Sequence, residues 1–276
     1  MSLKKSLAVA ATIVVAVFGA ALREFEECGT EEPGPEMRVV AAQMAADERA
    51  ASAVKVDAKR ASDIDIPTYI HVVSSSKSES DGNIPDSTVN AAISSMNDGY
   101  SGSGFQFSVQ KITRTVNADW SNNKNLETMK SKLRQGDFRT LNIYIVPKLV
   151  TSDGVGLNGQ CTFPFRSPKN VPQDGCIVRT GAYSNEQTTP HEVGHWLGLY
   201  HTFQGETDTK SCDTTNDYVD DTPAMKMTRG CDTDSDTCPG GGKDPVTNFM
   251  SYNSCRTVFT SGQHDRMNSM YNKYRA

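Results

Sequence analysis

The sequence has few of the features that mark nucleic-acid-binding or membrane-spanning proteins. Its 276 residues include 28 Lys and Arg against 33 Asp and Glu, so no basic field for nucleic acid is expected. Long hydrophobic runs are absent except for one, at residues 7–22. No Asn-X-Ser/Thr sequon occurs, so N-glycosylation is not expected. The chain is long enough for a sizeable core, and we expect a polar globular protein.

The single uncharged run has the layout of a secretory signal peptide. Lys4 and Lys5 precede it, and it ends in small residues at Gly19 to Ala21. A bilayer span needs about 20 apolar residues, whereas this run has 16, many of them alanine. Residues 1–20 are therefore predicted to be a signal peptide, with a membrane anchor as the weaker alternative. We expect a secreted, extracellular protein without a stable membrane anchor.

Residues 21–60 have the composition of a propeptide. Pro33-Gly34-Pro35 interrupts the segment, and residues 37–56 are Ala-rich with the spacing of an amphipathic helix. The segment ends in Lys59-Arg60, a dibasic pair of the kind that secretory processing proteases cleave. Such a pair is also common on solvated surfaces, so both interpretations stay open.

The next part of the chain alternates strand and helix patterns. Branched and aromatic residues predict strands over 64–73, 105–116 and 141–146. Between them, helices are predicted over 87–100, capped by Asp86 and burying Val89, Ile93 and Met96, and over 126–133. This order predicts an α/β layer.

A glycine-rich stretch follows, and its pattern indicates a bulged edge strand. Residues 154–165 become extended after their glycines, and 174–179 form another strand pattern. We expect a disulfide between Cys161 and Cys176 to join the two, since a secreted protein oxidises its cysteines. An extended peptide can add itself to such an edge by backbone hydrogen bonds. The alternative is an ordinary surface hairpin.

The densest chemical signal is the run HEVGHWLGLYH, which holds three of the five histidines. On a helix, His191 and His195 lie four residues apart on one face and can bind one metal ion. Glu192 is placed to serve a metal-bound water. A continuous helix would turn His201 away, but Gly198 can end the helix in a left-handed turn and return His201 as a third ligand.

Regular structure thins out after this motif. Residues 203–247 are dominated by Gly, Asp, Thr, Cys and Pro. So long an irregular segment is either disordered or held by covalent links and ions, and its cysteines favour the second. Thr260 and Ser261 then cap a last predicted helix over 262–274.

The histidine run resembles the extended zinc signature of the metzincin metalloproteases. Four further segments are similar to the pappalysin family of metzincins, and within it to the fungal extracellular metalloproteases: Leu199-Tyr200-His201-Thr202-Phe203, Asp221-Thr222-Pro223, Asn248-Phe249-Met250-Ser251-Tyr252 and Phe259-Thr260-Ser261-Gly262-Gln263. The resemblance extends from about Cys28 to the C-terminus. It implies an α/β (α+β) fold with a mixed twisted sheet and the active-site helix in residues 61–198. Residues 199–276 would form an irregular, disulfide-linked subdomain that ends in a helix.

The resemblance also implies how the site works. His191, His195 and His201 would bind one catalytic Zn²⁺ and leave its fourth position to water. Glu192 would be the general base that activates this zinc-bound water to hydrolyse peptide bonds. Met250 would form an apolar floor under the metal. Tyr252 would donate a hydrogen bond to the oxyanion; an ordinary core methionine and an ordinary tyrosine are the alternatives.

Two features of the irregular segment are also implied by the resemblance. The first is a crossed pair of disulfides, Cys212–Cys238 and Cys231–Cys255, which spacing alone does not select. The second is a bound Ca²⁺, because carboxylate and carbonyl oxygens are the ligands it prefers. Its candidate ligands are Asp213, Asp217, Asp220, Asp221 and Thr222. A solvated acidic loop is the alternative.

The seventh cysteine, Cys28, has no partner among these pairs. In Cys28-Gly29-Thr30 its thiolate is placed to become a fourth zinc ligand and displace the water, as a cysteine switch. A spare thiol is the alternative. Some bacterial relatives that prefer basic residues carry acids after the methionine turn. Here Asn253-Ser254-Cys255-Arg256 follows, so that specificity is not transferred.

The sequence thus predicts a secreted zinc endopeptidase that acts on proteins or peptides. A catalytically inactive, metal-stabilised binding module is the main alternative, and Glu192 argues against it because such a module has no use for an acid there. A zinc hydrolase of non-peptide esters or amides is disfavoured by the predicted edge strand. The sequence gives no indication of oligomeric state.

Overall fold

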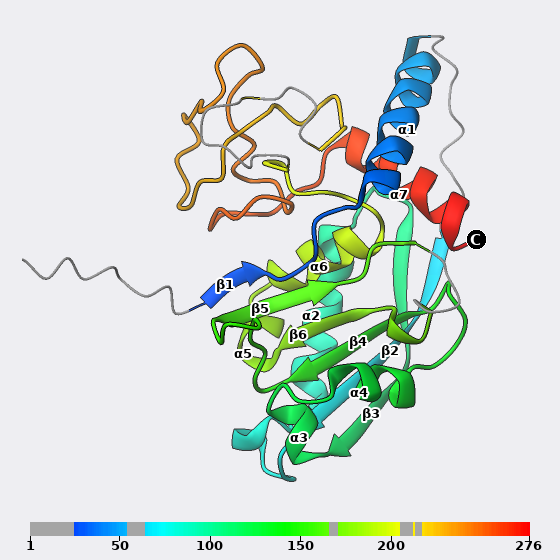
Figure 1. The fold of residues 1–276 in the computed structure, drawn as a ribbon, viewed down its shortest axis with the longest axis vertical. Helices are drawn as coiled ribbons and strands as arrows, with labels where there is room; N and C mark the ends of the chain where they lie inside the picture. Colours follow the sequence, from blue (N-terminus) through cyan, green and yellow to red (C-terminus); the bar gives the residue numbers. More distant parts are fainter. Residues whose placement is uncertain (1–24, 54–63, 166–170, 205–211, 213–216) are drawn as a thin grey trace, which may run out of the picture.

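The computed structural model describes residues 25–53, 64–165, 171–204, 212 and 217–276 (Figure 1). A mixed sheet has the strand order β1-β5-β6-β4-β2-β3. All neighbours run parallel except β5 and β6, which are antiparallel. The strands are β1 (Phe25–Cys28), β2 (Ile64–Ser74), β3 (Phe105–Val116), β4 (Leu141–Val146), β5 (Gly156–Cys161) and β6 (Cys176–Arg179).

Helices cover both faces of this sheet (Figure 1). α2 and α6 pack on the face that carries Ile143 and Ile145, whereas α3 and α4 pack on the face of Tyr144 and Val146. The helices are α1 (Pro35–Ala53), α2 (Asp86–Gly99), α3 (Ala118–Ser121), α4 (Leu126–Leu133), α5 (Thr180–Tyr183), α6 (Thr188–Trp196) and α7 (Ser261–Tyr274), with short 3₁₀ turns η1 (Glu79–Asp81) and η2 (Val171–Gln173). The predicted mixed α/β fold is confirmed.

One predicted helix cap is wrong. α2 begins at Asp86 itself, with Pro85 as the N-cap and no side-chain cap hydrogen bond. The Asp86 carboxylate instead accepts from the Arg114 guanidinium on β3. Asp86 still lies in the first turn, where the helix dipole favours a negative charge. The predicted buried face is confirmed, since Val89, Ile93 and Met96 are in the core.

The predicted edge strand β5 is covered by a strand that the sequence analysis did not predict. β1 pairs with it in the parallel direction, with Phe25 opposite Gly156 and Cys28 opposite Gly159. The chain then continues into α1, whose Met37, Ala41 and Met44 pack with Tyr200 and Met270. The N-terminal segment therefore runs from the edge of the sheet to α7.

The region from residue 199 onward is held by links other than sheet pairing. Within its described part, one helix occurs, α7, which begins with a capping box of Thr260 and Gln263. Disulfides join Cys212 to Cys238 and Cys231 to Cys255 within this region. A third disulfide, in the sheet region, joins Cys161 to Cys176. The predicted α7 and its cap agree with the structure.

No helix in the described ranges is long and apolar enough to cross a membrane. The predicted signal peptide and the Lys59-Arg60 pair lie outside these ranges. The division into residues 1–20, 21–60 and 61–276 stays a prediction.

Candidate metal centre and active site

The helix α6 presents the first two histidines to the interior. Every residue of α6 is buried, and His191 and His195 are 1% and 0% exposed. The helix ends at Trp196, and Gly198 follows with φ +96°. A Cβ at Gly198 would lie 2.6 Å from Met270 Cγ, so both conformation and space favour glycine. This turn carries the chain back to His201, as the sequence predicts.

The three imidazoles converge through their Nε2 atoms. His195 Nε2 lies 3.2 Å from His191 Nε2 and 3.1 Å from His201 Nε2. The opposite nitrogens are occupied: Nδ1 of His191 donates to the Phe249 carbonyl at 2.6 Å, and Nδ1 of His195 to the Leu199 carbonyl at 2.8 Å. A carbonyl only accepts, so in these two neutral rings Nε2 carries a lone pair.

These lone pairs point into a buried space, which fits a cation. Burial, followed by the neighbouring histidines, lowers the pKa of His191 and His201, and burial lowers that of His195 to about 4. Neutral rings whose lone pairs face one another repel unless a positive ion lies between them. The donor set is therefore that of a metal centre held by backbone-oriented histidines.

Glu192 lies beside these rings and is fully buried. Burial raises its pKa to about 8. Oε2 accepts from the Thr30 hydroxyl at 3.2 Å and from the Cys28 thiol at 3.5 Å, while Oε1 is buried without a partner. A Cβ at Gly159 would lie 2.7 Å from Glu192 Cγ, so the glycine of β5 makes room for this side chain.

Met250 and Tyr252 also lie beside the three histidines, which are called the metal cluster below. Met250 is buried, its sulfur lies against Gly194 of α6, and its carbonyl accepts from the Thr202 amide. The Tyr252 ring centre is 5.0 Å from that of His201 and 5.8 Å from that of His191. Burial raises the pKa of Tyr252, so its hydroxyl stays a donor, and it makes a long hydrogen bond of 3.5 Å to the Cys28 carbonyl.

Cys28 joins the three histidines. Its Sγ and one nitrogen from each ring lie within 4.8 Å of one another, the one such group of metal-binding side chains found in the described ranges. The thiol is buried and forms no disulfide. Burial and the Glu192 charge raise its pKa. The strand β1 thus brings a protonated thiol to the metal cluster from more than 160 residues away.

The candidate calcium ligands take part in several different hydrogen bonds and ion pairs. Asp217 is buried and accepts from the Thr222 hydroxyl and the Val219 amide, and burial raises its pKa to about 7. Asp220 pairs with Arg49 of α1 at 2.7 Å. Asp221 accepts from Thr260 and the Gly262 amide at the start of α7. Asp213 lies outside the described residues, and calcium binding stays a prediction.

Two contacts of the site were missed by sequence reasoning. Phe203 stacks on His201 at 4.9 Å with an interplanar angle of 7°. Thr30 donates to Glu192, and its hydroxyl also accepts from the Cys161 amide at 2.9 Å. Phe203 falls inside a segment that resembles the family, and Thr30 follows Cys28 by two residues. Their proximity to predicted site residues was the available signal.

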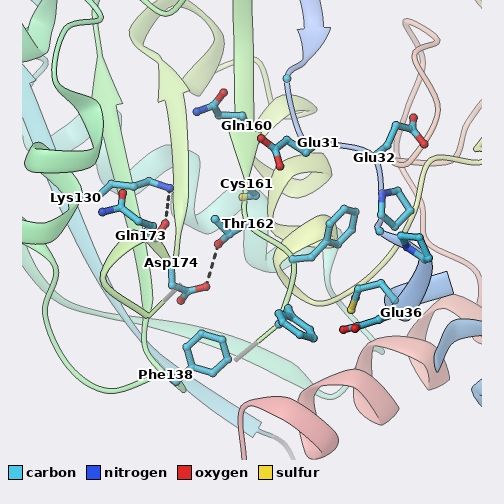
Figure 2. A pocket seen from close by; sticks show the side chains of 17 residues that line it. Glu31, Glu32, Glu36, Lys130, Phe138, Gln160, Cys161, Thr162, Gln173 and Asp174 are labelled. Carbon is cyan, nitrogen blue, oxygen red and sulfur yellow. Dashed lines mark hydrogen bonds between the residues drawn. The ribbon is translucent and has the colours of Figure 1, made fainter. Parts of the chain in front are cut away.

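A cavity of about 680 Å³ lies between the N-terminal segment and the sheet (Figure 2). One wall is formed by residues 29–37, and another by β5 and the residues that follow it. Figure 2 shows Asp174 accepting from Thr162, a bond of 3.0 Å, and Lys130 donating to Gln173. Phe163 lines the cavity, and its ring centre lies 5.5 Å from that of His195, so this side chain separates the cavity from the histidines.

A helix with two histidines and a glutamate, a third histidine after a glycine turn and a methionine turn define a metallopeptidase site. The model of the peptidase family M43, described as pregnancy-associated plasma protein-A, matches residues 125–272. The extracellular metalloprotease of Pyricularia oryzae is 39% identical over 90% of this chain and 89% of its own. Extracellular metalloprotease 1 of Coccidioides posadasii is 38% identical over 90% of each chain.

Two solved structures have a similar fold. A Tannerella forsythia promirolysin mutant matches with a TM-score of 0.66 and 24% identity, over 90% of this chain and 94% of its own. Mirolysin in complex with a small compound matches with a TM-score of 0.63 and 25% identity, over 78% and 94%. The chain belongs to the pappalysin family of metallopeptidases. It is an extracellular metalloendopeptidase with a catalytic metal, and its substrates are proteins.

Proposed function

We propose that the metal is zinc, that Glu192 is the general base, and that residues 21–60 are a propeptide which keeps the enzyme latent through Cys28. The observation that carries the zinc site is the convergence of three imidazole Nε2 atoms beside a buried glutamate. Zinc bonds of about 2.0–2.1 Å in a tetrahedral site separate two nitrogens by about 3.3 Å. The observed 3.1 and 3.2 Å agree with that spacing.

Bound zinc supplies a Lewis acid that polarises the peptide carbonyl and lowers the pKa of water. The protein supplies the proton transfers. Glu192 takes a proton from the attacking water and then delivers it to the nitrogen of the leaving amine. Its position supports this role, because the carboxylate lies beside the histidines and its Oε1 is buried without a partner. The peptide itself would lie along β5.

Tyr252 is proposed to stabilise the oxyanion. Its hydroxyl is protonated and already donates to a peptide carbonyl, that of Cys28, next to the metal cluster. In a substrate complex the same donor would face the carbonyl oxygen that gains negative charge. Removal of one such donor costs about 10²-fold or more in kcat.

The latency proposal rests on what β1 occupies. Its backbone takes the pairing positions of β5, and Cys28 faces the three histidines and Glu192. A thiolate bound to zinc would take the position that water needs. The thiol loses its proton on binding the metal, since only the thiolate is a ligand.

The decisive experiment compares Glu192→Gln with the wild-type chain. We expect both proteins to bind one zinc, measured by metal analysis, and the variant to lose at least about 10³-fold in casein hydrolysis. Chelator treatment followed by zinc should restore only the wild type. Unchanged proteolysis by the variant would refute the assigned base. Zinc binding without any proteolysis by the processed wild type would favour the inactive binding module.

The latency proposal has its own test. In the unprocessed chain, Cys28→Ser should raise peptidase activity towards that of the processed enzyme, because a hydroxyl is a weak zinc ligand. Ser101→Ala, at an exposed position between α2 and β3, is the control for a side-chain change that leaves latency intact. Full activity of the unprocessed wild-type chain would overturn the switch and leave the zinc peptidase proposal standing.

A further inference from the structure

Glu27, the residue before Cys28, places its carboxylate among the side chains of Arg256, Arg229 and Asn158, which together are called the recess below. Its Oε2 lies 3.2 Å from Arg256 Nη2, and its Oε1 lies 4.0 Å from Arg229 Nη1. Asn158 of β5 donates to the same Oε2 at 3.4 Å. Arg179 in turn donates to Asn158 Oδ1 at 2.8 Å, which turns the amide nitrogen of Asn158 towards the carboxylate. Three donors from distant parts of the chain thus converge on one acid.

Arg256 is built into the wall of this recess. Its side chain is 4% exposed. Nη1 donates to the Ser251 carbonyl at 2.9 Å and Nε to the Gln187 side chain at 3.4 Å, so the guanidinium plane is fixed. These two partners are neutral. Among the described residues, Glu27 is the one carboxylate within ion-pair distance of Arg256, and the same holds for Arg229.

The recess is next to the reacting centre. Arg256 is bonded to Ser251, which lies between Met250 and Tyr252. The Arg229 guanidinium lies 5.7 Å from the Tyr252 ring centre. Glu27 also directly precedes Cys28, whose thiol meets the metal cluster. A side chain in this recess therefore belongs to a residue adjacent to the scissile bond.

Release of β1 would remove the carboxylate and leave the donors in place. A guanidinium whose plane is fixed and whose carboxylate partner has left can bind another carboxylate through charge-assisted hydrogen bonds. The net charge of the chain is −5, so these arginines are a local exception rather than part of a general basic surface. The recess is complementary to an acidic side chain and repels Lys and Arg.

We propose that this recess is a substrate subsite selecting Glu or Asp next to the scissile bond, with Arg256 as its main specificity residue and Arg229 and Asn158 as secondary donors. The proposal rests on the peptidase function proposed above. β1 runs parallel to β5 and holds Glu27 on the Gly156 side of Cys28. In a substrate that pairs antiparallel to β5, the acidic residue is the one after the scissile bond.

The test uses the enzyme processed from the full-length chain. Cleavage of a randomised peptide library gives the preference at each position, and matched peptides with Glu, Gln or Lys after the scissile bond give kcat/KM ratios. We expect Glu over Gln by about tenfold or more, since a hydrogen bond between charged groups discriminates by that much. Lys should be the poorest of the three.

Variants assign the preference to the recess. Arg256→Gln should bring the Glu/Gln ratio to about one, and Arg256→Lys should keep part of it. Arg229→Gln, at a side chain that is 40% exposed, should lower the ratio about two- to threefold. Arg139→Gln, an exposed arginine in the loop before β4, is the matched control and should leave the ratio unchanged.

The outcomes separate this proposal from the one it rests on. If the wild-type enzyme cleaves the library without preferring an acid beside the scissile bond, the subsite proposal alone is overturned. A Glu preference that is unaltered in both Arg256→Lys and Arg229→Gln would overturn it as well. An enzyme that binds zinc but cleaves no peptide overturns the peptidase proposal. If Arg256→Gln does not fold, Arg256→Lys and Arg229→Gln decide the question.

Discussion

The sheet region, residues 64–198, and the region from 199 to the C-terminus gain their order in different ways. In the sheet region, β4 has all six residues buried, and apolar side chains fill both faces. The second region adds Phe259 and Met267 to the same core but has little regular structure in its described part. There, buried polar groups such as Asp217, Asn248 and Gln263 are paired by hydrogen bonds, and disulfides close the loops. The metal cluster lies where the two meet, since His191 and His195 come from α6 and His201 from beyond the glycine turn.

The contrast indicates that the two regions are destabilised by different kinds of substitution. Loss of apolar volume should unfold the sheet region and everything attached to it. Loss of a crosslink should loosen the second region first. The predictions below run from the largest expected effect to the smallest.

Ile143→Ala should lower the free energy of unfolding by about 4 kcal/mol, because it removes buried volume at the centre of the sheet. Ile143 is 0% exposed in the main core. Urea denaturation followed by circular dichroism measures the change. Val116→Ala, on the same sheet but 54% exposed, is the control and should change stability by less than about 0.5 kcal/mol. Equal effects at the two positions would contradict the comparison.

Replacement of Cys231 and Cys255 by serine should cost about 3 kcal/mol, because the disulfide closes a loop with a sequence separation of 24. The effect should be local. We expect protease cuts within 217–257 in a limited trypsin digest while 64–198 stays intact. Ser254→Ala, at an exposed neighbouring position, should leave the digest unchanged. Simultaneous loss of both regions would show that they do not behave separately.

Gly198→Ala tests the connection between the two regions. Alanine at φ +96° is strained, and its Cβ would meet Met270, so we expect a loss of about 2 kcal/mol together with weaker zinc binding as His201 shifts. Gly230→Ala has a similar φ of +89° but nothing within 4 Å of the added Cβ. It should cost about 1 kcal/mol and leave zinc affinity, measured by competition with a chelating dye, unchanged.

Asp217 gives the second region a pH dependence. Burial raises its folded-state pKa to about 7. At pH values between the ordinary pKa of an aspartic acid and 7, the folded state therefore binds more protons than the unfolded state. Stability from this group is present at low pH and falls as pH rises through 7. Asp217→Asn should reduce the fall in melting temperature across this pH interval, measured by thermal denaturation at a series of pH values.

Calcium should bind the chain in which the Asp217 carboxyl group is ionised. If the acidic segment binds Ca²⁺, millimolar calcium chloride at pH 8 should raise the stability of the wild-type chain by about 1–2 kcal/mol. Asp217→Asn should respond less, and magnesium at the same concentration should have a smaller effect. A wild-type chain indifferent to calcium would rule out the predicted calcium site.

Local patterns in the sequence predicted the regular elements well. β3, β4 and α4 have the predicted bounds, because alternation and helical spacing are properties of neighbouring residues. The four-residue helices α3 and α5 were missed, since one turn is too short to show a period. Asn117, which accepts from the Asp119 and Trp120 amides, was the available sign of α3.

Pairing over long distances was harder to predict. β1 is four residues long and has no clear alternation, so its place on β5 was not expected. Asp86 was assigned a cap because its partner Arg114, 28 residues later, was not visible in the local pattern. The recess around Glu27 joins residues up to 229 positions apart, and no spacing rule reveals it.

The sequence by itself determined the spacing of the three histidines proposed to bind the metal, because four residues along a helix and a glycine before the last histidine specify one common point. It also determined the longer strands and helices, and their order along the chain, through local hydrophobic periodicity. Only the tertiary structure decided what faces that point. The pairing of β1 with β5 brings the Cys28 thiol to the histidines, and the fold beyond Met250 brings Arg256 to Glu27. Such contacts depend on packing between distant segments, which no local pattern encodes.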